Sequence, residues 1–587
     1  MCGIAGLMTS SGSAPDSAAL DTMRRALLHR GPDGDGVWSG GDTGLVHTRL
    51  AIIDLETGDQ PLFEPGGAVL VANGEIYNYV ELRAEMPDVD FRTRSDCEPA
   101  LYCYRRYGLD FAEWLRGMYA IAVYDAPAGR LVIARDPFGI KPLCYAESSA
   151  GFAFASEPEA LLAAGFGRRK LRAGPIRELL NLQFSTGRET PFEGIERVLP
   201  GETIAVECGR IVERRRRAAL PDGGPRAIRE EAALDALDAA LADSVDVHQR
   251  SDVPFAMFLS GGIDSSAVLA LMARLNDRPV RAYTAAFPGT GAADERATAR
   301  RVATALGAEH VEVEFGAEDF WSLLPAIAGA MDDPAADYAI LPTWKLAQEA
   351  AKTHKVILSG EGGDELFGGY GRYRSAMRPR LFGGRPMRRR GTLQGLGILR
   401  EEGAGWRDGI AAGEATAATP GRTRLQAAQA ADCADWLPND LLTKLDRCLM
   451  AHSVEGRTPF LDPAVANFAF RLPDALKVRG RTGKYLLRKW LARTVPVAEA
   501  EAPKQGFTVP VGEWIAAEGA RIGPLVAAQP GIAGLCRPGA VETLFVSGAR
   551  SHSLAAWTLL FYALWHQRHI AAAAPGGDAF EALSART

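Results

Sequence analysis

From Val253 onward the chain follows a repeating rhythm of a short apolar run, a turn and then a helical pattern. An apolar run without polar alternation is typical of a strand covered on both faces, as in parallel sheets flanked by helices. The rhythm therefore predicts a doubly wound α/β domain. The expected strands are 253–259, 280–286, 310–315 and 355–358, and the expected helices are 265–275 and 294–306.

The first 205 residues differ, because their apolar runs are short and are broken by Gly, Pro, Asn and Asp. They predict an α+β domain with antiparallel sheets and tight turns. We expect strands within 44–53, 68–72, 118–124 and 131–134, and helices near 17–28 and 98–107. The domains expected are 2–207, a linker at 208–229 rich in Arg, Pro and Gly, 230–570, and a flexible tail at 571–587. The second domain opens with a helix at 230–248 and becomes mostly helical from 430, whereas residues 380–430 fit no element.

Composition narrows the class of protein. The net charge of −6 over 587 residues provides no basic field for nucleic acid, and the Arg runs at 214–217 and 388–390 are interpreted as solvated loops. Eight cysteines without a CxxC pair predict neither a zinc ribbon nor a disulfide framework. No signal peptide and no apolar stretch of roughly 20 residues is present, and 554–565 is expected to be a buried helix. We expect a cytoplasmic protein that uses neither a membrane nor a nucleic acid.

Cys2 is the most reactive candidate in the first domain. Removal of Met1 would leave one residue that carries both a thiol and a free α-amine. A thiolate is a strong nucleophile, and an amine with a pKa of roughly 7.7–8.0 can act as its base near neutral pH.

A second candidate site is the loop at 260–266, Ser-Gly-Gly-Ile-Asp-Ser-Ser, between an expected strand and helix. Adjacent glycines let backbone amides approach a phosphate, and the loop is not a Walker motif. It fits the pyrophosphate-binding loop of ATP-using adenylating enzymes. The acidic glycine loop at 359–365 follows another strand, so Asp264 and Asp364 should meet at one edge of the sheet. Two carboxylates there suit Mg²⁺.

These motifs belong to a longer series that resembles glutamine-hydrolysing asparagine synthetase over nearly the whole chain. The similar segments are 2–6, 29–34, 49–54, 73–78, 135–139, 260–266, 360–370, 441–447, 459–462 and 484–489. The resemblance implies an N-terminal nucleophile hydrolase domain of four layers (αββα), followed by an α/β parallel-sheet ATP-pyrophosphatase domain with a helical C-terminal part. It also implies a ligase that uses L-glutamine, ATP, Mg²⁺ and L-aspartate and forms L-asparagine through a β-aspartyl-AMP intermediate. Whether the protein forms a homodimer is left open.

For the first domain, the resemblance implies that Cys2 attacks the side-chain amide of glutamine. Asn73 and the Gly74 amide would form the oxyanion hole, where donors must be aimed in advance. Arg49 would bind the α-carboxylate of glutamine, and Glu75 and Asp96 its α-ammonium. The remaining residues implied in glutamine binding are Leu50, Ile52 and Ile53.

For the second domain, the resemblance places ATP at Ser260, Gly261, Gly262, Asp264, Ser265 and Ser266. Leu259 and Ala285 would lie near the adenosine, and Ser359 and Gly360 near the phosphates. Glu361 would assist formation of the acyl-adenylate, and Lys504 would steady its transition state. Free ammonia would be protonated in bulk water, so we expect a water-poor passage with apolar residues between the two sites.

The sequence indicates the mechanism more firmly than it indicates the identity of the acceptor acid. Gly456 and Thr458 depart from the family pattern beside the expected acceptor pocket, and the Arg-rich segment 375–430 has no family motif. The same mechanism acting on a peptide, polyketide or sugar acid is therefore the main alternative. A tRNA thiolase would need a basic face and catalytic CxxC cysteines, and a non-catalytic sensor would usually have lost Cys2 or Asp264.

Overall fold

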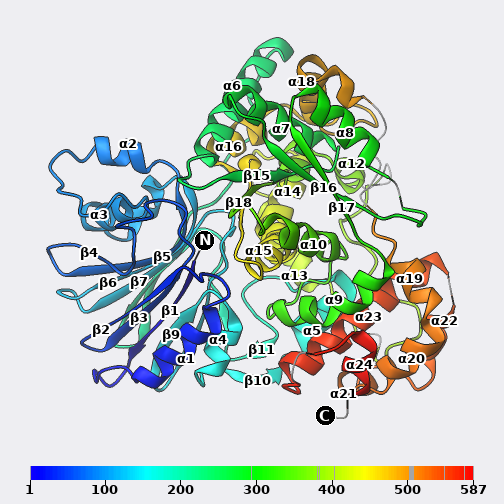
Figure 1. Ribbon diagram of the computed structural model, residues 1–587, viewed down its shortest axis with the longest axis horizontal. Coiled ribbons are helices and arrows are strands. Elements are labelled where there is room, and N and C mark those ends of the chain that lie inside the picture. The colour runs from blue at the N-terminus through cyan, green and yellow to red at the C-terminus, as the bar shows by residue number, and fades with distance from the viewer. Residues whose placement is uncertain are drawn as a thin grey trace.

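The first part of the molecule contains two antiparallel sheets of six strands each (Figure 1). The computed structural model describes residues 2–292, 294–379, 381, 384–401, 403–501, 508–547, 549–573 and 576–585. Across the first sheet the order is β12 (Glu196–Arg197), β8 (Cys144–Ser148), β9 (Gly151–Ala155), β1 (Gly3–Thr9), β3 (Thr43–Arg49) and β2 (Gly34–Gly40). Across the second it is β14 (Arg210–Arg216), β13 (Glu202–Glu207), β7 (Arg130–Arg135), β6 (Gly117–Asp125), β5 (Ala68–Ile76) and β4 (Leu62–Phe63).

The two sheets pack face to face with helices on their outer faces. Side chains such as Ile4 of β1 and Val71 of β5 fill the layer between the sheets. Helix α1 (Ser17–Leu27) covers the first sheet, and α3 (Glu98–Tyr107) covers the second. The expected four-layer α+β domain is confirmed. Its smaller elements are α2 (Tyr79–Ala84), η1 (Gly108–Trp114), α4 (Pro158–Ala163), β10 (Arg168–Leu171), α5 (Ala173–Leu182) and β11 (Phe192–Glu193).

Strand β14 lies inside the segment 208–229 that we interpreted as a linker. It pairs with β13 from Arg210 opposite Glu207 to Arg216 opposite Glu202. The basic run at 214–217 is therefore mostly an exposed edge strand and not a loop. Charged edge strands resist pairing with another chain. The prediction failed because a strand exposed on both faces has no apolar alternation to reveal it.

The second part is organised around a five-stranded sheet in which every pairing is parallel. Its order is β17 (Glu309–Glu314), β16 (Arg281–Ala286), β15 (Phe255–Phe258), β18 (Val356–Leu358) and β19 (Glu455–Arg457). Ala256 and Met257, adjacent on β15, belong to different apolar clusters, so both faces of the sheet are buried. The expected α/β domain is confirmed. The helices around it are α6 (Glu230–His248), α7 (Ile263–Leu275), α8 (Arg296–Ala305), α9 (Ala317–Ala330), α10 (Ile340–Ala350), α11 (Gly363–Phe367) and α15 (Thr443–Met450).

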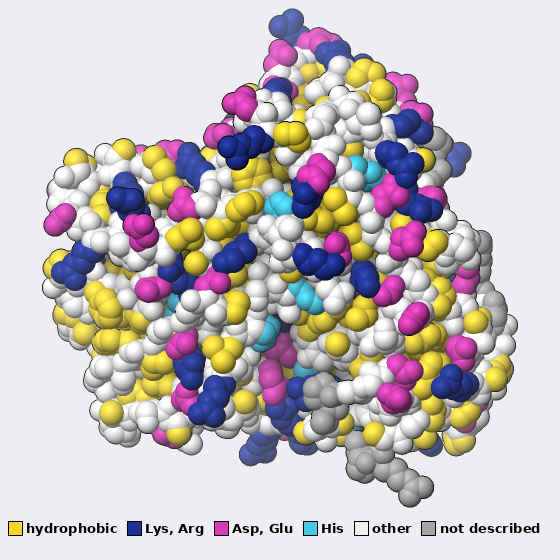
Figure 2. All heavy atoms as spheres, in the orientation of Figure 1, with side chains coloured by type: hydrophobic (Ala, Val, Ile, Leu, Met, Phe, Trp, Pro, Cys, Tyr) yellow, Lys and Arg dark blue, Asp and Glu magenta, His cyan; other side chains and the backbone are white. Residues whose placement is uncertain are grey.

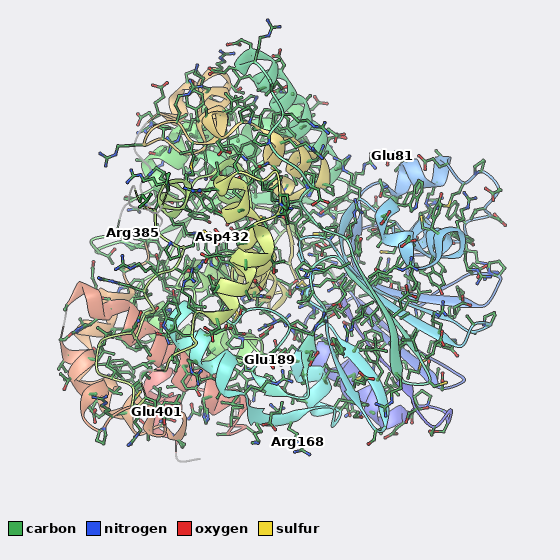
Figure 3. All side chains as sticks on the ribbon, turned by 180° about the vertical axis from the view of Figure 1, so that it is seen from behind. Glu81, Arg168, Glu189, Arg385, Glu401 and Asp432 are labelled. Carbon is green, nitrogen blue, oxygen red and sulfur yellow. The ribbon has the colours of Figure 1, made fainter. Side chains whose placement is uncertain are left out.

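Helices fill the rest of the second part, including the segment that fitted no element. α12 (Gly371–Met377) precedes that segment, which contains α13 (Asp408–Ala417) and most of α14 (Arg424–Ala431), and the π-helical η3 (Asp432–Leu442) follows. Seen from behind in Figure 3, Asp432 and Arg385 lie on the side away from Glu81 and the antiparallel sheets. The later elements are η4 (Pro459–Leu461), α16 (Pro463–Arg471), α17 (Asp474–Lys477), α18 (Tyr485–Thr494), η5 (Pro496–Ala498), α19 (Val511–Ala517), α20 (Gly519–Ala527), α21 (Pro530–Ala533), α22 (Ala540–Val546), α23 (Arg550–His569) and α24 (Ala579–Ser584).

The expected flexible tail at 571–587 is wrong for its described part. Helix α24 begins at a capping box on Asp578, and Phe580 and Leu583 are buried. The Phe580 ring lies 4.7 Å from the ring of Trp321 on α9. The residues expected as a buried helix, 554–565, lie within α23.

The surface drawn in Figure 2 shows acidic and basic side chains interspersed, without a broad region of one sign. Among the described residues, no helix is long and apolar enough to cross a membrane. The long helix α23 owes its apolar character to packing inside the protein, where Trp557 and Trp565 are fully buried.

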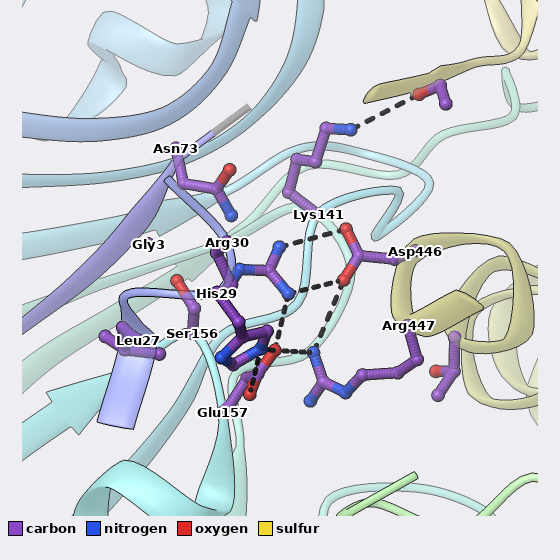
Figure 4. Close-up of polar contacts among 12 residues, drawn as sticks. Gly3, Leu27, His29, Arg30, Asn73, Lys141, Ser156, Glu157, Asp446 and Arg447 are labelled. Atoms are coloured by element: carbon purple, nitrogen blue, oxygen red, sulfur yellow. Dashed lines mark hydrogen bonds and ion pairs between the residues drawn. The ribbon is translucent and has the colours of Figure 1, made fainter. Parts of the chain in front are cut away.

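Five charged side chains are buried together where the two parts meet, and Figure 4 shows four of them, Arg30, Glu157, Asp446 and Arg447. Arg30 donates to Glu157 Oε1 at 2.6 Å and to the two oxygens of Asp446 at 2.8 and 3.1 Å. Arg447, beside Asp446 on α15, reaches Glu157 at 3.2 Å and Asp332 at 2.9 Å. Although burial opposes ionisation of Asp446, the two arginines hold the pKa of its carboxyl below the usual value. This interface network therefore joins the first part to α15 of the second.

Apolar side chains of the first part enter the core of the second part beside this network. Leu50, Tyr77, Phe138 and Ile140 belong to the same cluster as the buried faces of α6 and α7. The expected apolar interface is thus present, and the structure identifies its residues.

Asp446→Asn should destabilise the protein strongly, because it leaves buried Arg30 and Arg447 to share Glu157 in place of two carboxylates. Breaking one side of a buried pair costs about 3–5 kcal/mol. Chemical denaturation should show this loss, and limited proteolysis should show easier cleavage between the two parts. The matched control is Glu231→Gln, whose carboxylate pairs with Arg493 at side-chain exposures of 71% and 54%, and which should leave the denaturation midpoint unchanged. Equal shifts in both variants would contradict the role given to the network.

Candidate functional site

Cys2 lies at the entrance to β1 and is buried, with 8% of its surface exposed. Its backbone nitrogen donates to Asn73 Oδ1 at 3.1 Å, and Arg30 Nε donates to its carbonyl oxygen at 3.1 Å. Because the Cys2 nitrogen requires an acceptor, Asn73 must present its oxygen to it, and the Nδ2 donor is left over. Among the described residues, that buried Nδ2 has no partner. An amide donor directed at the space beside the thiol is what an oxyanion hole requires.

Gly74 follows Asn73 on β5 in a conformation that other residues rarely adopt, with φ at 155°. A Cβ at this position would lie 2.1 Å from the carbonyl oxygen of Met118 on the paired strand β6. Only glycine therefore fits where β5 passes the nucleophile. Burial raises the pKa of the Cys2 thiol, and a backbone hydrogen bond from Leu50 opposes this shift.

Asp96 and Glu75, both expected to hold an ammonium, differ in their surroundings. Asp96 Oδ2 accepts from the Ile76 amide at 2.7 Å, and burial raises the pKa of Asp96 to about 6. Glu75 instead faces Arg457 of β19 at 3.2 Å, across the boundary between the two parts. Burial and nearby Glu455 raise the pKa of Glu75 well above its usual value. Asp96 is thus the more suitable of the two for binding a cation.

Arg49 ends β3 and lies on the same side of the first part as Cys2 and Asn73. Its Nη1 pairs with Asp59 at 2.7 Å, and its Nη2 donates to the Asp54 carbonyl. Asp59 is 80% exposed, so a ligand carboxylate could replace it at little cost. Leu50 and Ile52 are buried in the interface cluster, and Ile53 packs against that cluster.

In the second part, two glycine loops meet at the carboxyl ends of β15 and β18. Gly261 has φ at 70°, and α7 begins at Ile263 directly after the loop. A Cβ on Gly360 would lie 2.9 Å from the Asp264 Cβ, and one on Gly363 would lie 2.5 Å from Asp264 Oδ1. Glycine is thus required for the loops to approach this closely. They line a cavity of about 680 Å³.

Most residues expected to bind ATP lie in this cavity. The lining includes Leu259, Ser260, Gly261, Gly262, Asp264, Ser265, Ala285, Ser359, Gly360, Glu361 and Asp364. Ser266 is fully buried in α7 and is not part of the lining, which differs from the expectation. Lys504 lies outside the described residues.

Lys484 connects Asp264 and Asp364, and the sequence analysis had given it no role. Its Nζ contacts Asp264 Oδ2 and lies 2.7 Å from Asp364 Oδ1. Burial disfavours the ammonium, but the two carboxylates outweigh this and hold the pKa of Lys484 above its usual value. Two carboxylates that share one cation beside a phosphate-type loop also fit Mg²⁺, which favours few carboxylates together with phosphate oxygens and water. Among the described residues, no group of three or more His, Cys, Asp or Glu side chains forms a further metal site.

Lys444 of α15 is a second cation that the sequence analysis missed. It lies 3.3 Å from both Glu361 and Asp337. Four residues earlier, Asp440 accepts from Trp436 Nε1 at 2.6 Å, and burial raises the pKa of Asp440 to about 7. These residues form one wall of the cavity beside the loop of Glu361.

Gly456 and Thr458 lie elsewhere than expected, because neither lines this cavity. Gly456 is in β19, and a Cβ there would press on Leu445 and Leu449 of α15 at 3.1–3.2 Å. The departure from the family pattern therefore serves packing between a strand and a helix. Strand β19 was missed because its residues, Glu-Gly-Arg, form no apolar run.

Two known protein families match successive parts of the chain. Residues 1–216 match a glutamine amidotransferase domain, and residues 236–567 match asparagine synthase. The chain is 35% identical to a putative glutamine-hydrolysing asparagine synthetase of Mycobacterium bovis, over 96% of this chain and 97% of that protein. It is 31% identical to glutamine-hydrolysing asparagine synthetase 1 of Bacillus subtilis over 97% of each, and 32% identical to amidase chry2 of Gibberella zeae over 64% of this chain and 60% of that protein. The chain therefore belongs to the asparagine synthase family, as a glutamine-hydrolysing amidotransferase of the asparagine synthetase type.

Proposed function

We propose that this protein amidates L-aspartate to L-asparagine, with ammonia from L-glutamine and with ATP converted to AMP and pyrophosphate. The observation that carries the proposal is the pairing of Cys2 with Asn73, whose Nδ2 is left without a partner among the described residues. The same chain holds a phosphate-type loop beside Asp264, Asp364 and Lys484. The first part would supply the nitrogen donor, and the second part would supply the activated acid.

In the proposed glutaminase step, Met1 has been removed and the α-amine of Cys2 takes the thiol proton. Sγ attacks the side-chain amide carbon of glutamine, and the developing oxyanion is bound by Asn73 Nδ2 and the Gly74 amide. The C–N bond then breaks, the amine returns its proton to the leaving nitrogen, and ammonia departs. Water hydrolyses the remaining thioester to glutamate and restores Cys2.

In the proposed synthetase step, an oxygen of the β-carboxylate of aspartate attacks the α-phosphorus of ATP. The bond to the β-phosphate breaks and pyrophosphate leaves, so β-aspartyl-AMP forms. Lys484 and the glycine loops hold the phosphates, and Mg²⁺ at Asp264 and Asp364 would neutralise charge on pyrophosphate. Ammonia then attacks the acyl carbon, AMP leaves, and one proton is lost. Without adenylation the carboxylate would have no adequate leaving group.

Ammonia must reach the second site before it is protonated. The apolar residues Leu50, Tyr77, Phe138 and Ile140 of the first part belong to the same core cluster as the helices of the second part. An apolar passage favours the neutral molecule over ammonium, because burial of an ion without a partner is costly. We propose that ammonia crosses the interface here.

We retain a larger carboxylic acid as an alternative acceptor, because a cavity of about 680 Å³ leaves room for more than aspartate beside ATP. One relative of similar identity is named an amidase. A larger carboxylic acid would use the same two steps.

Cys2→Ala should abolish glutamine-dependent synthesis, because no nucleophile remains to release ammonia. Ammonia-dependent synthesis should continue at the rate of the unaltered protein, since the second site is intact. Asparagine and AMP are measured with glutamine and, separately, with ammonium chloride at pH 8. Loss of both activities in a folded variant would contradict the separation of the two sites.

The pH dependence of kcat/KM for glutamine should reveal the ionisation of Asp96. The Cys2 amine must be neutral to act as base, so log(kcat/KM) should fall with a slope of one below roughly pH 8. Because the pKa of Asp96 is about 6, its carboxylate is lost below that pH and the slope should steepen to two. Asp96→Asn should lower kcat/KM above pH 6, keep a slope of one throughout and approach the unaltered protein at lower pH. A slope that stays at one in the unaltered protein would remove Asp96 from glutamine binding.

Lys484→Met should cut ammonia-dependent pyrophosphate release by about 10²–10³-fold, the usual cost of one preorganised electrostatic contact. Glutaminase activity should be unchanged. Lys489→Met is the matched control, because Lys489 lies on helix α18, which begins directly after Lys484, but pairs with Glu230 at the surface. Equal losses in the two variants would show that the helix and not the bridging ammonium is responsible.

A further inference from the structure

Arg388 lies in the wall of the synthetase cavity and forms no hydrogen bond with the described part of the chain. Its Nε and Nη2 atoms are shut off from solvent. Nearby Asp432 and Asp440 attract the guanidinium but do not hydrogen-bond to this edge. Leaving a buried donor edge without an acceptor is unfavourable, so its retention calls for a ligand that supplies one. Arg388 belongs to the Arg-rich segment that had no family motif.

The surrounding structure holds Arg388 in place. Its neighbour Met387 is fixed on both sides, because the Met387 amide donates to Glu414 at 3.0 Å and Arg407 donates to the Met387 carbonyl at 2.8 Å. Arg388 itself has φ at 48°. Its guanidinium carbon lies 4.4 Å from the ring centroid of Trp436 and 5.1 Å from that of Phe184. The free edge is therefore preorganised.

The edge formed by Nε and Nη2 binds carboxylates elsewhere in this chain. Arg372, whose guanidinium also lies over Trp436 at 4.0 Å, uses it to bind Asp432 at 3.0 and 2.7 Å. Arg197 uses it to bind Asp333, with both distances 2.6 Å. Of these two arginines that lie over Trp436, only Arg372 is hydrogen-bonded to a carboxylate among the described residues. The free edge of Arg388 matches a carboxylate in the same planar, two-point geometry.

Asp440 places an acceptor for a cation on the same wall. Its Oδ2 is occupied by Trp436 Nε1, whereas its buried Oδ1 has no partner among the described residues. Lys444, one helical turn further, connects this wall to Glu361 in the loop beside the phosphates. One side of the cavity thus offers separate positions for an anion and for a cation.

We propose that Arg388 binds the non-reacting carboxylate of the acceptor acid and that Asp440 binds its ammonium. The acceptor is then an α-amino acid that carries a second carboxylate, and this second carboxylate is adenylated beside Glu361. This assignment rests on the proposed function, since it concerns the acceptor of that reaction. It adds the two residues that would bind the non-reacting carboxylate and the ammonium of the acceptor.

The test compares three acids in ammonia-dependent pyrophosphate release, as substrates or as competitive inhibitors against aspartate. L-Aspartate carries both recognised groups, succinate lacks the ammonium, and β-alanine lacks the non-reacting carboxylate. Arg388→Met should raise KM or Ki for aspartate and succinate roughly 10–100-fold and leave β-alanine within twofold. Asp440→Asn should weaken aspartate and β-alanine but not succinate. KM for ATP should stay constant in both.

Arg389→Met is the matched control, because Arg389 is the exposed neighbour of Arg388, and it should match the unaltered protein for all three acids. If Arg388→Met has a lowered thermal midpoint, Arg388→Lys serves instead, since it keeps the charge without the planar fork and should weaken aspartate by a smaller factor. Weakening of all three acids alike by the Arg388 variants would overturn the assignment.

Failure of the proposed function gives a different pattern. In that case the unaltered protein releases no pyrophosphate with aspartate but does so with another acid. The Arg388 assignment is then judged on that acid. Removing its non-reacting carboxylate must cost the unaltered protein the same factor as Arg388→Met costs with the intact acid, and the two changes together must cost no more. Additive losses would overturn the assignment.

Discussion

The position of Cys2 relative to the synthetase cavity depends on the buried charges of the interface network. Arg30 donates to the Cys2 carbonyl and also to Asp446 of α15, so one side chain connects the two sites. Glu157, Arg447 and Asp332 complete the network, and each member compensates a charge that would otherwise be buried alone. Ion pairs of this kind are a poor source of net stability but tolerate little change in geometry. They are suited to fixing two domains in one relative orientation.

Burial controls the chemistry on both sides of this interface. It raises the pKa of Asp96 to about 6 and that of Asp440 to about 7, whereas Lys484 stays charged because two carboxylates face it. A buried carboxylate with a raised pKa interacts strongly with any cation that restores its charge. The same low polarity at the apolar interface favours neutral ammonia. In the proposed reaction, exclusion of water serves substrate binding and nitrogen transfer together.

Sequence patterns predicted the elements whose signal is local. The glycine loops at 260–266 and 359–365 and the apolar strands beside them lie where expected, since a strand, a turn and a helix are adjacent in sequence. Lys484 was missed because it meets Asp264 across 220 positions, and no local pattern encodes such a contact. Strands β14 and β19 were missed because neither has an apolar rhythm, and α24 because its short apolar face follows a stretch of Ala, Pro and Gly.

The two walls of the synthetase cavity are constrained in different ways. On the phosphate side, Gly360 and Gly363 approach Asp264 so closely that a Cβ would collide, so backbone contacts leave little freedom for substitution. On the wall beside the Glu361 loop, Arg388 and Asp440 contribute side chains only, from a segment without regular structure and from a π-helix, a form of helix that often occurs at functional sites. Side chains there can change without moving the phosphate loops. The architecture thus allows the acceptor to be selected independently of the adenylation chemistry, which explains why motifs identify the reaction more readily than the acid.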